Sequence, residues 1–272
     1  MENKRASTQA EVVLVNPCLK LFIFEKTDST NRLAKDFARG MPLDELPTGE
    51  CYCPDMNYLF IANEQSKGKG RLGRRFESDA GVGLYMSYLF SPNLPPERIT
   101  NLTAYAAVCS AEAIENLCGG EVGIKWVNDL YIGGKKAAGI LTEASLSPEG
   151  GISYAAVGIG INIKSRDFGE LAHIATTLED GLGATPDPKE LALSISKSLA
   201  EYEKAEASDF MKKYRAKNIV IGKTVRVTPI RGESYISHAV DIADSGELVL
   251  EDEHGCRHTI SAADVSVKLS QI

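Results

Sequence analysis

The sequence predicts a mixed α/β body that ends near Lys217 and is followed by a small β domain. Up to that residue, apolar segments typical of strands alternate with segments whose apolar residues recur at helical spacing. Beyond Gly222 the pattern changes to short strands separated by the turn sequences RGES, DSGE and DEHG. We therefore divide the chain into two domains, residues 1–217 and residues 218–272.

The first part of the body alternates predicted strands and helices. The strands are LKLFIFEK, YLFIANE and GVGLYMSYLF, which are rich in aromatic and β-branched residues. A short helix is expected over residues 31–39, with Asp28 or Ser29 as its N-cap. A longer helix is expected in PERITNLTAYAAVCSAEAIENL, where apolar residues lie at helical spacing. Residues 40–57, rich in proline, glycine and acidic residues, are expected to form a loop.

The second part begins with a predicted hairpin, GIKWVNDLYIGGKKAAGILTEAS, whose Gly-Gly pair is typical of a tight turn. The segment GISYAAVGIGINIK is predicted to be a buried strand. Between residues 187 and 217, apolar residues again recur at helical spacing, which predicts a helix there. The short strands after Gly222 predict a small barrel of about 50 residues.

Composition and charge argue against several classes of protein. The chain is 43% hydrophobic and 25% charged, as ordinary soluble globular proteins are. Its net charge of −7 argues against a general nucleic-acid binder, which should be broadly basic. The sequence offers neither an apolar run long enough for a membrane helix nor a secretory signal. We therefore expect a cytoplasmic protein without a membrane partner.

The chain contains six cysteines, which we expect to be free thiols because no export signal precedes them. Only Cys51 and Cys53 lie close together in the sequence. Zinc sites usually combine such a pair with a second pair of ligands, and none follows here. We therefore expect no structural metal.

A glycine-rich segment with five basic side chains contrasts with the acidic net charge. We refer to residues 67–75, KGKGRLGRR, as the basic loop. Its glycines allow the backbone to approach a ligand closely, and arginine offers two parallel donors to a phosphate or a carboxylate. The segment matches neither a P-loop nor a GxGxxG that precedes a helix. A site for a mononucleotide or acidic metabolite and a solvated charge run both stay open at this point.

Two further segments carry cations. KWVNDL places Lys125, Asn128 and Asp129 next to the tryptophan, at a turn between two short strands. GGKKAAGIL brings Lys135 and Lys136 to the start of an apolar strand, where one of them should point toward the interior or a cleft. A buried lysine is unfavourable unless it meets an anion. These segments also have plain interpretations: Trp126 as a core residue, Asp129 as a turn residue and Lys136 as the exposed end of a hairpin.

Five motifs together resemble the catalytic domain of biotin–protein ligases in order and spacing: TDSTN, EQSKGKGRLGR, KWVNDL, GGKKAAGILTE and VGIGINI. The later ATTLED is similar to the Ala-Thr-Ser-Leu segment of that family. The resemblance runs from about Leu19 to the C-terminus. It implies an α/β (α+β) fold: a mixed-sheet catalytic domain similar to class II aminoacyl-tRNA synthetases, followed by an SH3-like β-barrel.

The resemblance implies a ligase that uses ATP and Mg²⁺ to convert biotin to biotinyl-5′-AMP. The enzyme then transfers biotin to one lysine of a biotin carboxyl carrier protein or domain. Cations that gather a carboxylate and a phosphate, with a metal-neutralised pyrophosphate as leaving group, suit this chemistry. By the same resemblance, catalysis is assigned to Arg71, Lys136 and Asp129, and Asp129 is also assigned to Mg²⁺.

Substrate contacts are assigned from the matching positions of the motifs. The ureido group of biotin is neutral and needs hydroxyl and amide partners, which Ser29, Thr30, Asn31 and Gln65 supply. The implied biotin contacts are Ser29, Thr30, Asn31, Gln65, Lys69, Gly70, Arg71, Lys136 and Gly139. The implied ATP contacts are Arg71, Arg74, Lys125, Asn128, Lys136 and Asn162.

The sequence departs from the family pattern at two positions. Arginine is common in the family where Lys69 stands, so a bidentate contact is expected to be lost there. Proline is common where Val127 stands, which affects the rigidity of that turn but removes no chemical group.

Some members of the family carry an N-terminal winged helix-turn-helix of about 60 residues, whereas about 20 precede the first predicted strand here. We therefore expect the short form of the ligase and no DNA partner; a homodimer is compatible with the resemblance. The alternatives are a lipoate–protein ligase-like acyl-adenylating transferase and a catalytically inactive biotin- or adenylate-binding protein. A nucleic-acid binder that uses the basic loop is a third alternative, which the acidic balance disfavours.

Overall fold

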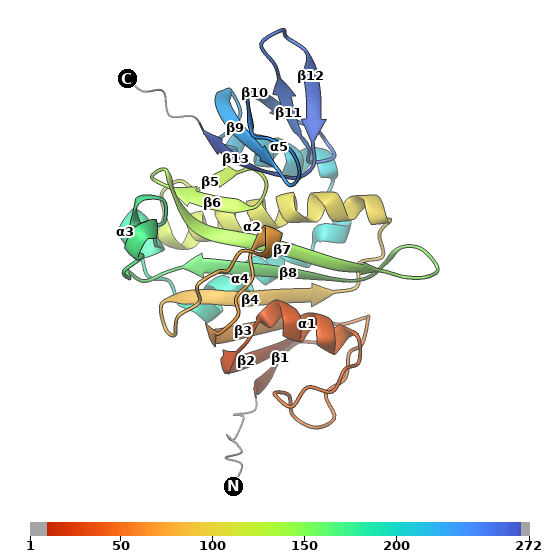
Figure 1. The fold of residues 1–272 in the computed structure, drawn as a ribbon. Coiled ribbons are helices and arrows are strands. Elements are labelled where there is room, and N and C mark those ends of the chain that lie inside the picture. Colours follow the sequence, from red (N-terminus) through yellow and green to blue (C-terminus); the bar gives the residue numbers. More distant parts are fainter. Residues whose placement is uncertain (1–9, 268–272) are drawn as a thin grey trace.

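The computed structural model describes residues 10–267 and arranges them around two sheets (Figure 1). The strands of the large sheet are β1 (Glu11–Asn16), β2 (Leu19–Thr27), β3 (Asn57–Gln65), β4 (Gly83–Phe90), β5 (Gly123–Lys125), β6 (Asp129–Ile132), β7 (Lys135–Leu146) and β8 (Ile152–Asn162). Within the described residues their order is β1-β2-β3-β4-β8-β7-β6-β5. β2 and β3 are parallel and the other neighbours are antiparallel, so the sheet is mixed.

Helices cover both faces of the large sheet. They are α1 (Thr30–Ala38), α2 (Ile99–Cys118), α3 (Leu178–Leu182), α4 (Pro188–Leu199) and α5 (Ala207–Lys217), with 3-10 turns at Arg71–Gly73, Pro96–Arg98, Gly169–His173 and Tyr202–Lys204. α1 packs on β3, β4 and β8, whereas α2 packs on β7 and α4 packs beside it on β4; α5 packs against α2 and β5. The sheet therefore lies between a single short helix and a layer of longer helices.

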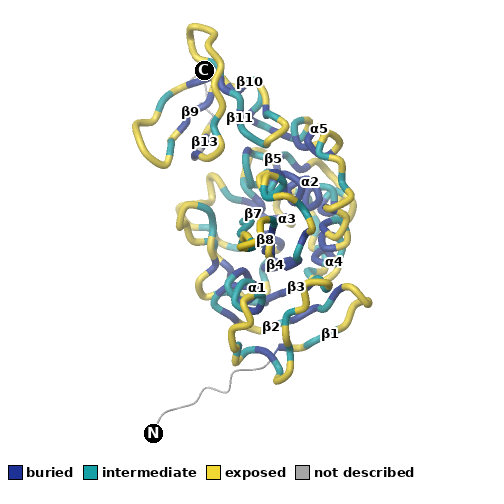
Figure 2. Tube along the Cα trace, turned by 90° about the vertical axis from the view of Figure 1, so that its right-hand side faces the viewer, coloured by how far each residue is buried: buried dark blue, intermediate teal, exposed yellow. Residues whose placement is uncertain are grey.

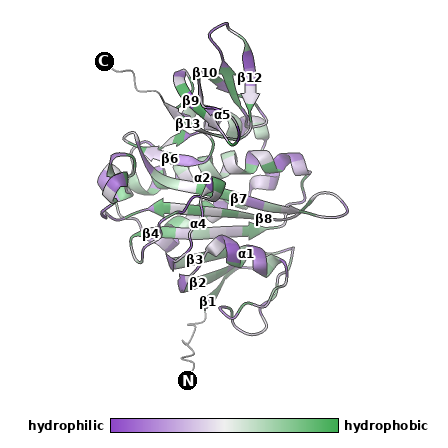
Figure 3. Ribbon diagram, in the orientation of Figure 1, coloured by the Kyte–Doolittle hydropathy of each residue, from purple (hydrophilic) through white to green (hydrophobic). Residues whose placement is uncertain are grey.

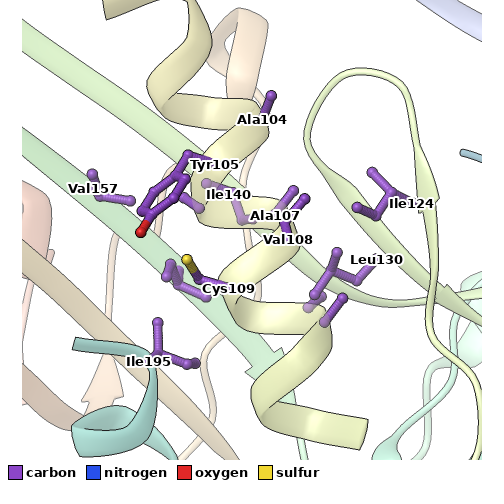
Figure 4. Close-up of a cluster of buried hydrophobic side chains, with 14 of the residues drawn as sticks. Ala104, Tyr105, Ala107, Val108, Cys109, Ile124, Leu130, Ile140, Val157 and Ile195 are labelled. Atoms are coloured by element: carbon purple, nitrogen blue, oxygen red, sulfur yellow. The ribbon is translucent and has the colours of Figure 1, made fainter. Parts of the chain in front are cut away.

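Alternating side chains of the central strands supply two separate cores. On β2, Leu21 faces the core beneath α2, while Phe22 and Phe24 face α1, because successive residues of a strand point to opposite faces. Phe37 of α1 packs against Phe22, with ring centroids 5.5 Å apart. Figure 4 shows the α2 side, where Tyr105 and Cys109 lie among apolar side chains of the sheet. Figure 3 shows hydrophobic residues along the central strands and hydrophilic residues on α1.

The small sheet is antiparallel and follows α5 in the chain. Its strands are β9 (Lys223–Pro229), β10 (Tyr235–Ile242), β11 (Leu248–Glu251), β12 (Arg257–Ile260) and β13 (Ala263–Val267). Among the described residues they lie in the order β12-β11-β10-β9-β13. The predicted fold class, a large mixed sheet followed by a small all-β unit, is confirmed. The gap between α5 and β9 is where we place the domain boundary, at 217/218, and that division stays a prediction.

The single helix predicted over residues 187–217 is wrong. α4 ends at Leu199, Tyr202 lies in a 3-10 turn, and Ala205 and Glu206 are extended before α5 begins. A straight helix of this length would be about 46 Å long, longer than the roughly 30 Å of α2. The break lets both halves pack on α2, and Tyr202 is buried in the bend. The sequence prediction also missed β1, an edge strand whose Leu14 is 61% exposed, and the short α3.

Hydrogen bonds join the small sheet to the body near the start of α2. The indole Nε1 of Trp126 donates to the carbonyl oxygen of Gly246 at 2.9 Å, and Nδ2 of Asn101 donates to the carbonyl oxygen of Asp244 at 3.0 Å. Figure 2 shows buried chain continuing from the sheet and α2 to the strands of the small sheet. The apolar core of the body also continues into the small sheet through Val225 and Leu250. None of the helices found in residues 10–267 is long and apolar enough to cross a membrane.

Candidate active site

A cavity of about 140 Å³ lies between the basic loop, the start of α1 and the middle of the large sheet. Thirteen of the fourteen residues that the motifs predicted for the site line this cavity. They come from six separate segments: Ser29, Thr30 and Asn31; Gln65; Lys69, Gly70, Arg71 and Arg74; Lys125, Asn128 and Asp129; Lys136; and Gly139. The fold thus collects in one place predicted residues that lie far apart in the sequence, such as Ser29 and Gly139.

Asn162 is the predicted residue that does not line the cavity. It ends β8, is 7% exposed, and its Nδ2 donates to the carbonyl oxygen of Thr176 at 3.2 Å. The side chain therefore ties β8 to the segment before α3. Its assignment to ATP stays a prediction.

One end of the cavity is lined by neutral polar groups. Oε1 of Gln65 accepts from the backbone nitrogen of Thr30 at 2.8 Å and lies 3.1 Å from the Thr30 hydroxyl. Nε2 of Gln65 donates to the Ser78 hydroxyl at 3.0 Å. Because the backbone nitrogen of Thr30 can only donate, it fixes which side of the Gln65 amide carries the oxygen. Ser29 is the N-cap of α1, yet its side chain makes no capping hydrogen bond. The Ser29 hydroxyl is therefore not committed to the helix and can bond a ligand.

Asp28 fixes the backbone at the start of α1, next to the neutral end of the cavity. Its Oδ1 accepts from the backbone nitrogen of Ser29 at 2.6 Å and from Nε of Arg32 at 2.5 Å. Arg32 also bonds Asp36 and Glu45, and these carboxylates raise the pKa of its guanidinium despite partial burial, which by itself lowers it. The backbone nitrogen of Lys67 donates to the carbonyl oxygen of Asp28 at 2.8 Å, which connects the α1 start to the basic loop.

Glycines on β8 leave the room that the cavity occupies. A Cβ atom on Gly158 would lie 2.4 Å from Oδ1 of Asn31, and one on Gly160 would lie 2.5 Å from the ring of Phe76. Both residues line the cavity, with Met86 and Ile159 beside them. These positions were missed as site residues, although VGIGINI signals them, because residues two apart on a strand share a face.

The other end of the cavity carries cations. Nζ of Lys136 lies 2.7 Å from Oδ1 of Asp129, and the Lys136 side chain is 36% exposed. Nη1 of Arg71 donates to Oδ1 of Asn128 at 3.1 Å. Asn128 is itself fixed by Ile140, whose carbonyl oxygen accepts from Nδ2 at 2.8 Å and whose nitrogen donates to the Asn128 carbonyl oxygen at 2.9 Å. Lys125 lies over the ring of Tyr131, 5.5 Å from its centroid.

The turn that carries Asn128 is packed on buried groups. Trp126 is 4% exposed, so its interpretation as a core residue holds alongside its place on the cavity wall. The hydroxyl of Tyr214 donates to the carbonyl oxygen of Val127 at 2.8 Å. Burial raises the pKa of Tyr214, and Asp129 adds to that effect while Arg71 opposes it, so the phenol stays a neutral donor. The peptide bond between Trp126 and Val127 is cis.

The basic loop folds back on itself beside the cavity. The nitrogen of Gly70 donates to the carbonyl oxygen of Arg74 at 2.8 Å, and the nitrogen of Phe76 donates to that of Gly68 at 2.9 Å. Leu72 at its tip has φ 56° and is 51% exposed. A non-glycine residue in this left-handed conformation is uncommon. Leu72 lines the cavity together with Arg71 and Arg74, so the tip of the basic loop borders the cavity with one apolar and two cationic side chains.

Asp129 by itself does not make a metal site. Its Oδ1 is paired with Lys136, and residues 10–267 contain no group of three or more His, Cys, Asp or Glu side chains that could hold a metal ion. Magnesium is commonly bound by one or two carboxylates together with substrate phosphates and water. The residues present therefore fit a single contact to a magnesium ion that arrives with a nucleotide.

The thiols of Cys51 and Cys53 are free and exposed.

Comparison with known families defines the class to which this fold and site belong. The sequence model of the Biotin/lipoate A/B protein ligase family matches residues 52–162, and that of the biotin protein ligase C-terminal domain matches residues 220–268. The biotin–[acetyl-CoA-carboxylase] ligase of Paracoccus denitrificans is 30% identical over 251 residues, which cover 88% of this chain and 97% of that protein. The chain belongs to the biotin–protein ligase family.

Two further similarities bear on the extent of the match. The bifunctional ligase/repressor BirA of Bacillus spizizenii is 34% identical over 211 residues, and the matched part spans 64% of that protein's length and 75% of this chain. The structure of a biotin protein ligase from Aquifex aeolicus in complex with biotin and ATP superposes with a TM-score of 0.70 at 26% identity. That match covers 92% of this chain and 99% of the other. The similarity thus includes both sheets.

Proposed function

We propose that this protein activates biotin with ATP to biotinyl-5′-AMP and transfers biotin to a lysine of a biotin carboxyl carrier protein or domain. The observation that carries the proposal is the division of one cavity into two chemically different ends. Neutral hydrogen-bonding groups around Thr30 and Gln65 lie at one end, and Arg71 and Lys136 lie at the other. Biotin has the same polarity along its length: a neutral ureido head, an apolar body and a carboxylate tail.

The neutral end would hold the head of biotin. Ser29, Thr30, Asn31 and Gln65 supply hydroxyl and amide groups, which suit a urea because it both donates and accepts hydrogen bonds. Lys69 and Gly70 of the basic loop and Gly139 of β7 would border the bicyclic ring and the tail. The side-chain-free surface of Gly158 and Gly160 and the ring of Phe76 suit the carbon skeleton between the two ends.

The cationic end would carry the first reaction. An oxygen of the biotin carboxylate attacks the α-phosphorus of ATP, the bond from that phosphorus to the bridging oxygen breaks, and pyrophosphate leaves. Lys136 and Arg71 would hold the carboxylate and the α-phosphate together and stabilise the charge that develops between them. Arg74, Lys125 and Asn128 would hold the nucleotide. Asp129 would contact a magnesium ion that arrives with ATP, and such an ion would neutralise charge on the pyrophosphate.

In the second reaction the neutral amine of the acceptor lysine attacks the carbonyl carbon of biotinyl-5′-AMP. The carbon–oxygen bond to AMP breaks, AMP leaves with the electron pair, and the nitrogen loses a proton to give the amide. The proposal places the protein in the cytoplasm, as a homodimer or a monomer, without DNA as a partner.

Purified protein, biotin, Mg-ATP and a biotin carrier domain should yield a carrier whose mass rises by one biotinyl group. The matched control is a carrier whose acceptor lysine is changed to arginine, which should gain no mass. Lipoate in place of biotin tests the neighbouring activity of the same class. Transfer of lipoate rather than biotin, or adenylate formation with neither acid, would refute the proposal.

A further inference from the structure

The side chain of Asn31 is fixed by three protein partners. It is 4% exposed and lies in the first turn of α1. The Ser87 hydroxyl, fully buried on β4, lies 2.6 Å from Oδ1 of Asn31. On the other side of the amide, Nδ2 donates to the carbonyl oxygen of Leu141 at 3.2 Å and to the carboxylate of Glu143 at 3.0 Å. Both amide hydrogens are thus used by acceptors of the protein itself.

These partners allow only one orientation of the Asn31 amide. A carbonyl and a carboxylate are acceptors, so the NH₂ group must face them. A rotated amide would instead place its oxygen against two other oxygens. Glu143 is held in turn by Lys35, whose Nζ lies 2.5 Å from Oε1 of Glu143, and the two side chains are only 31% and 18% exposed.

The orientation of the Asn31 amide affects the hydroxyl groups at the neutral end of the cavity through Ser87. An Asn31 oxygen aimed at Ser87 attracts the Ser87 hydroxyl proton. The Ser87 oxygen is then left to accept from the Thr30 hydroxyl, 2.8 Å away. The Thr30 hydroxyl then gives its only proton to Ser87, and Oε1 of Gln65, 3.1 Å away, keeps the backbone nitrogen of Thr30 as its donor. The chain Glu143–Asn31–Ser87–Thr30 therefore sets which of these amide and hydroxyl atoms donate and which accept.

We propose that Glu143, supported by Lys35, is a positioning residue for the head of biotin. Glu143 does not line the cavity; it acts by fixing the Asn31 amide and, through it, the hydrogen-bond pattern presented to the ligand. The inference rests on the proposed function, because it concerns recognition of biotin at that site. The competing interpretation is an ion pair that only fastens α1 to β7 and contributes stability alone.

The decisive variant is Glu143→Gln, which keeps the shape of the side chain but weakens the hold of Lys35 and permits the Asn31 amide to rotate. We expect the Kd for biotin, measured by calorimetry without ATP, and the KM for biotin to rise about tenfold. The KM for ATP, and kcat at saturating biotin, should stay within about twofold of the wild-type values. A merely structural ion pair would lower the melting temperature without separating biotin from ATP in this way.

A matched control is Glu50→Gln, which removes the half-buried ion pair of Glu50 with Lys20, 2.7 Å apart and away from the cavity lining. This variant should leave the biotin Kd unchanged. A double-mutant cycle supplies the second check: in an Asn31→Ala background, Glu143→Gln should change the biotin Kd by less than about twofold, because the intermediary is gone. If Glu143→Gln fails to fold, Ser87→Ala probes the same network from the opposite side and should also weaken biotin binding selectively.

Equal loss of biotin and ATP affinity in Glu143→Gln, an unchanged biotin Kd, or full additivity with Asn31→Ala would each overturn the inference. Failure of the proposed function is a separate result. In that case the wild-type protein itself would bind no biotin and label no carrier domain.

Discussion

The Nζ atom of Lys136 lies 2.7 Å from Oδ1 of Asp129, on the neighbouring strand of the large sheet. Both side chains line the cavity, and neither is fully withdrawn from solvent. An ion pair that is open on one side gains little net stability, because water and other anions compete for its charges. Lys136 can therefore exchange Asp129 for a carboxylate or a phosphoryl oxygen without a large cost.

Lys136→Ala should leave biotin binding largely intact and reduce the rate of adenylate formation about 100-fold or more. A cation aimed at charge that develops during the reaction stabilises the transition state more than the ground state. Formation of biotinyl-5′-AMP from biotin and α-labelled ATP measures this rate. Lys135→Ala is the control: its Nζ donates to the carbonyl oxygen of Ala172 and it does not line the cavity. A wild-type rate in Lys136→Ala would show that Lys136 is only a hairpin residue and has no role in adenylate formation.

Arg71→Gly should weaken retention of the mixed anhydride by roughly 2–4 kcal/mol, the value of a charge-assisted contact in a closed site. Biotinyl-5′-AMP that escapes reacts with exposed amines, so unrelated proteins should become biotinylated on surface lysines. The assay mixes the variant, biotin, ATP and a bystander protein without a carrier domain. Lys67→Gly removes a basic-loop charge that does not line the cavity, and it should label bystanders no more than the wild type does. Equal labelling by Arg71→Gly and wild type would contradict a retaining role for Arg71.

Gly158→Ala should reduce biotin affinity by about tenfold or more while ATP affinity changes little. The added Cβ would lie 2.4 Å from Oδ1 of Asn31, so that either the Asn31 amide or the strand must move. Calorimetric titration with each substrate separates the two affinities. Parallel loss of both affinities would indicate a general distortion of β8 instead.

Cys109 should stay unreactive toward a thiol reagent in the native protein at neutral pH, whereas the exposed Cys18, Cys51, Cys53 and Cys256 react quickly. Burial raises the pKa of the Cys109 thiol from 9.0 to about 12. The folded-state pKa lies above the unfolded value, so its stabilising contribution is fully present below about pH 9 and is lost as the pH rises toward 12. Cys109→Ala should therefore make the melting temperature less sensitive to pH in that range. Rapid native-state labelling of Cys109 would argue against this packing.

The motifs located the cavity well because its lining comes from short segments with distinctive polar residues. TDSTN, the basic loop and GGKKAAGIL lie far apart in sequence, and only strand pairing brings them together. Ser87 and Glu143 were not predicted as site residues, although Glu143 ends the motif GGKKAAGILTE, because their importance comes from contacts with Asn31 across the sheet. The bend at Tyr202 was missed for a similar reason, since helical spacing continues through it and packing on α2 decides where the helix breaks.

The hydrogen bond from Trp126 to the Gly246 carbonyl has a consequence for how the chain can be divided. Ala263 and Val265 of β13 also belong to the wall of the cavity. Cutting the chain after residue 217 would leave the Trp126 indole without its acceptor, two residues from Asn128, and would open one side of the cavity to water. The wall of the cavity thus needs residues of both sheets, and a chain shortened to the body would lack part of it.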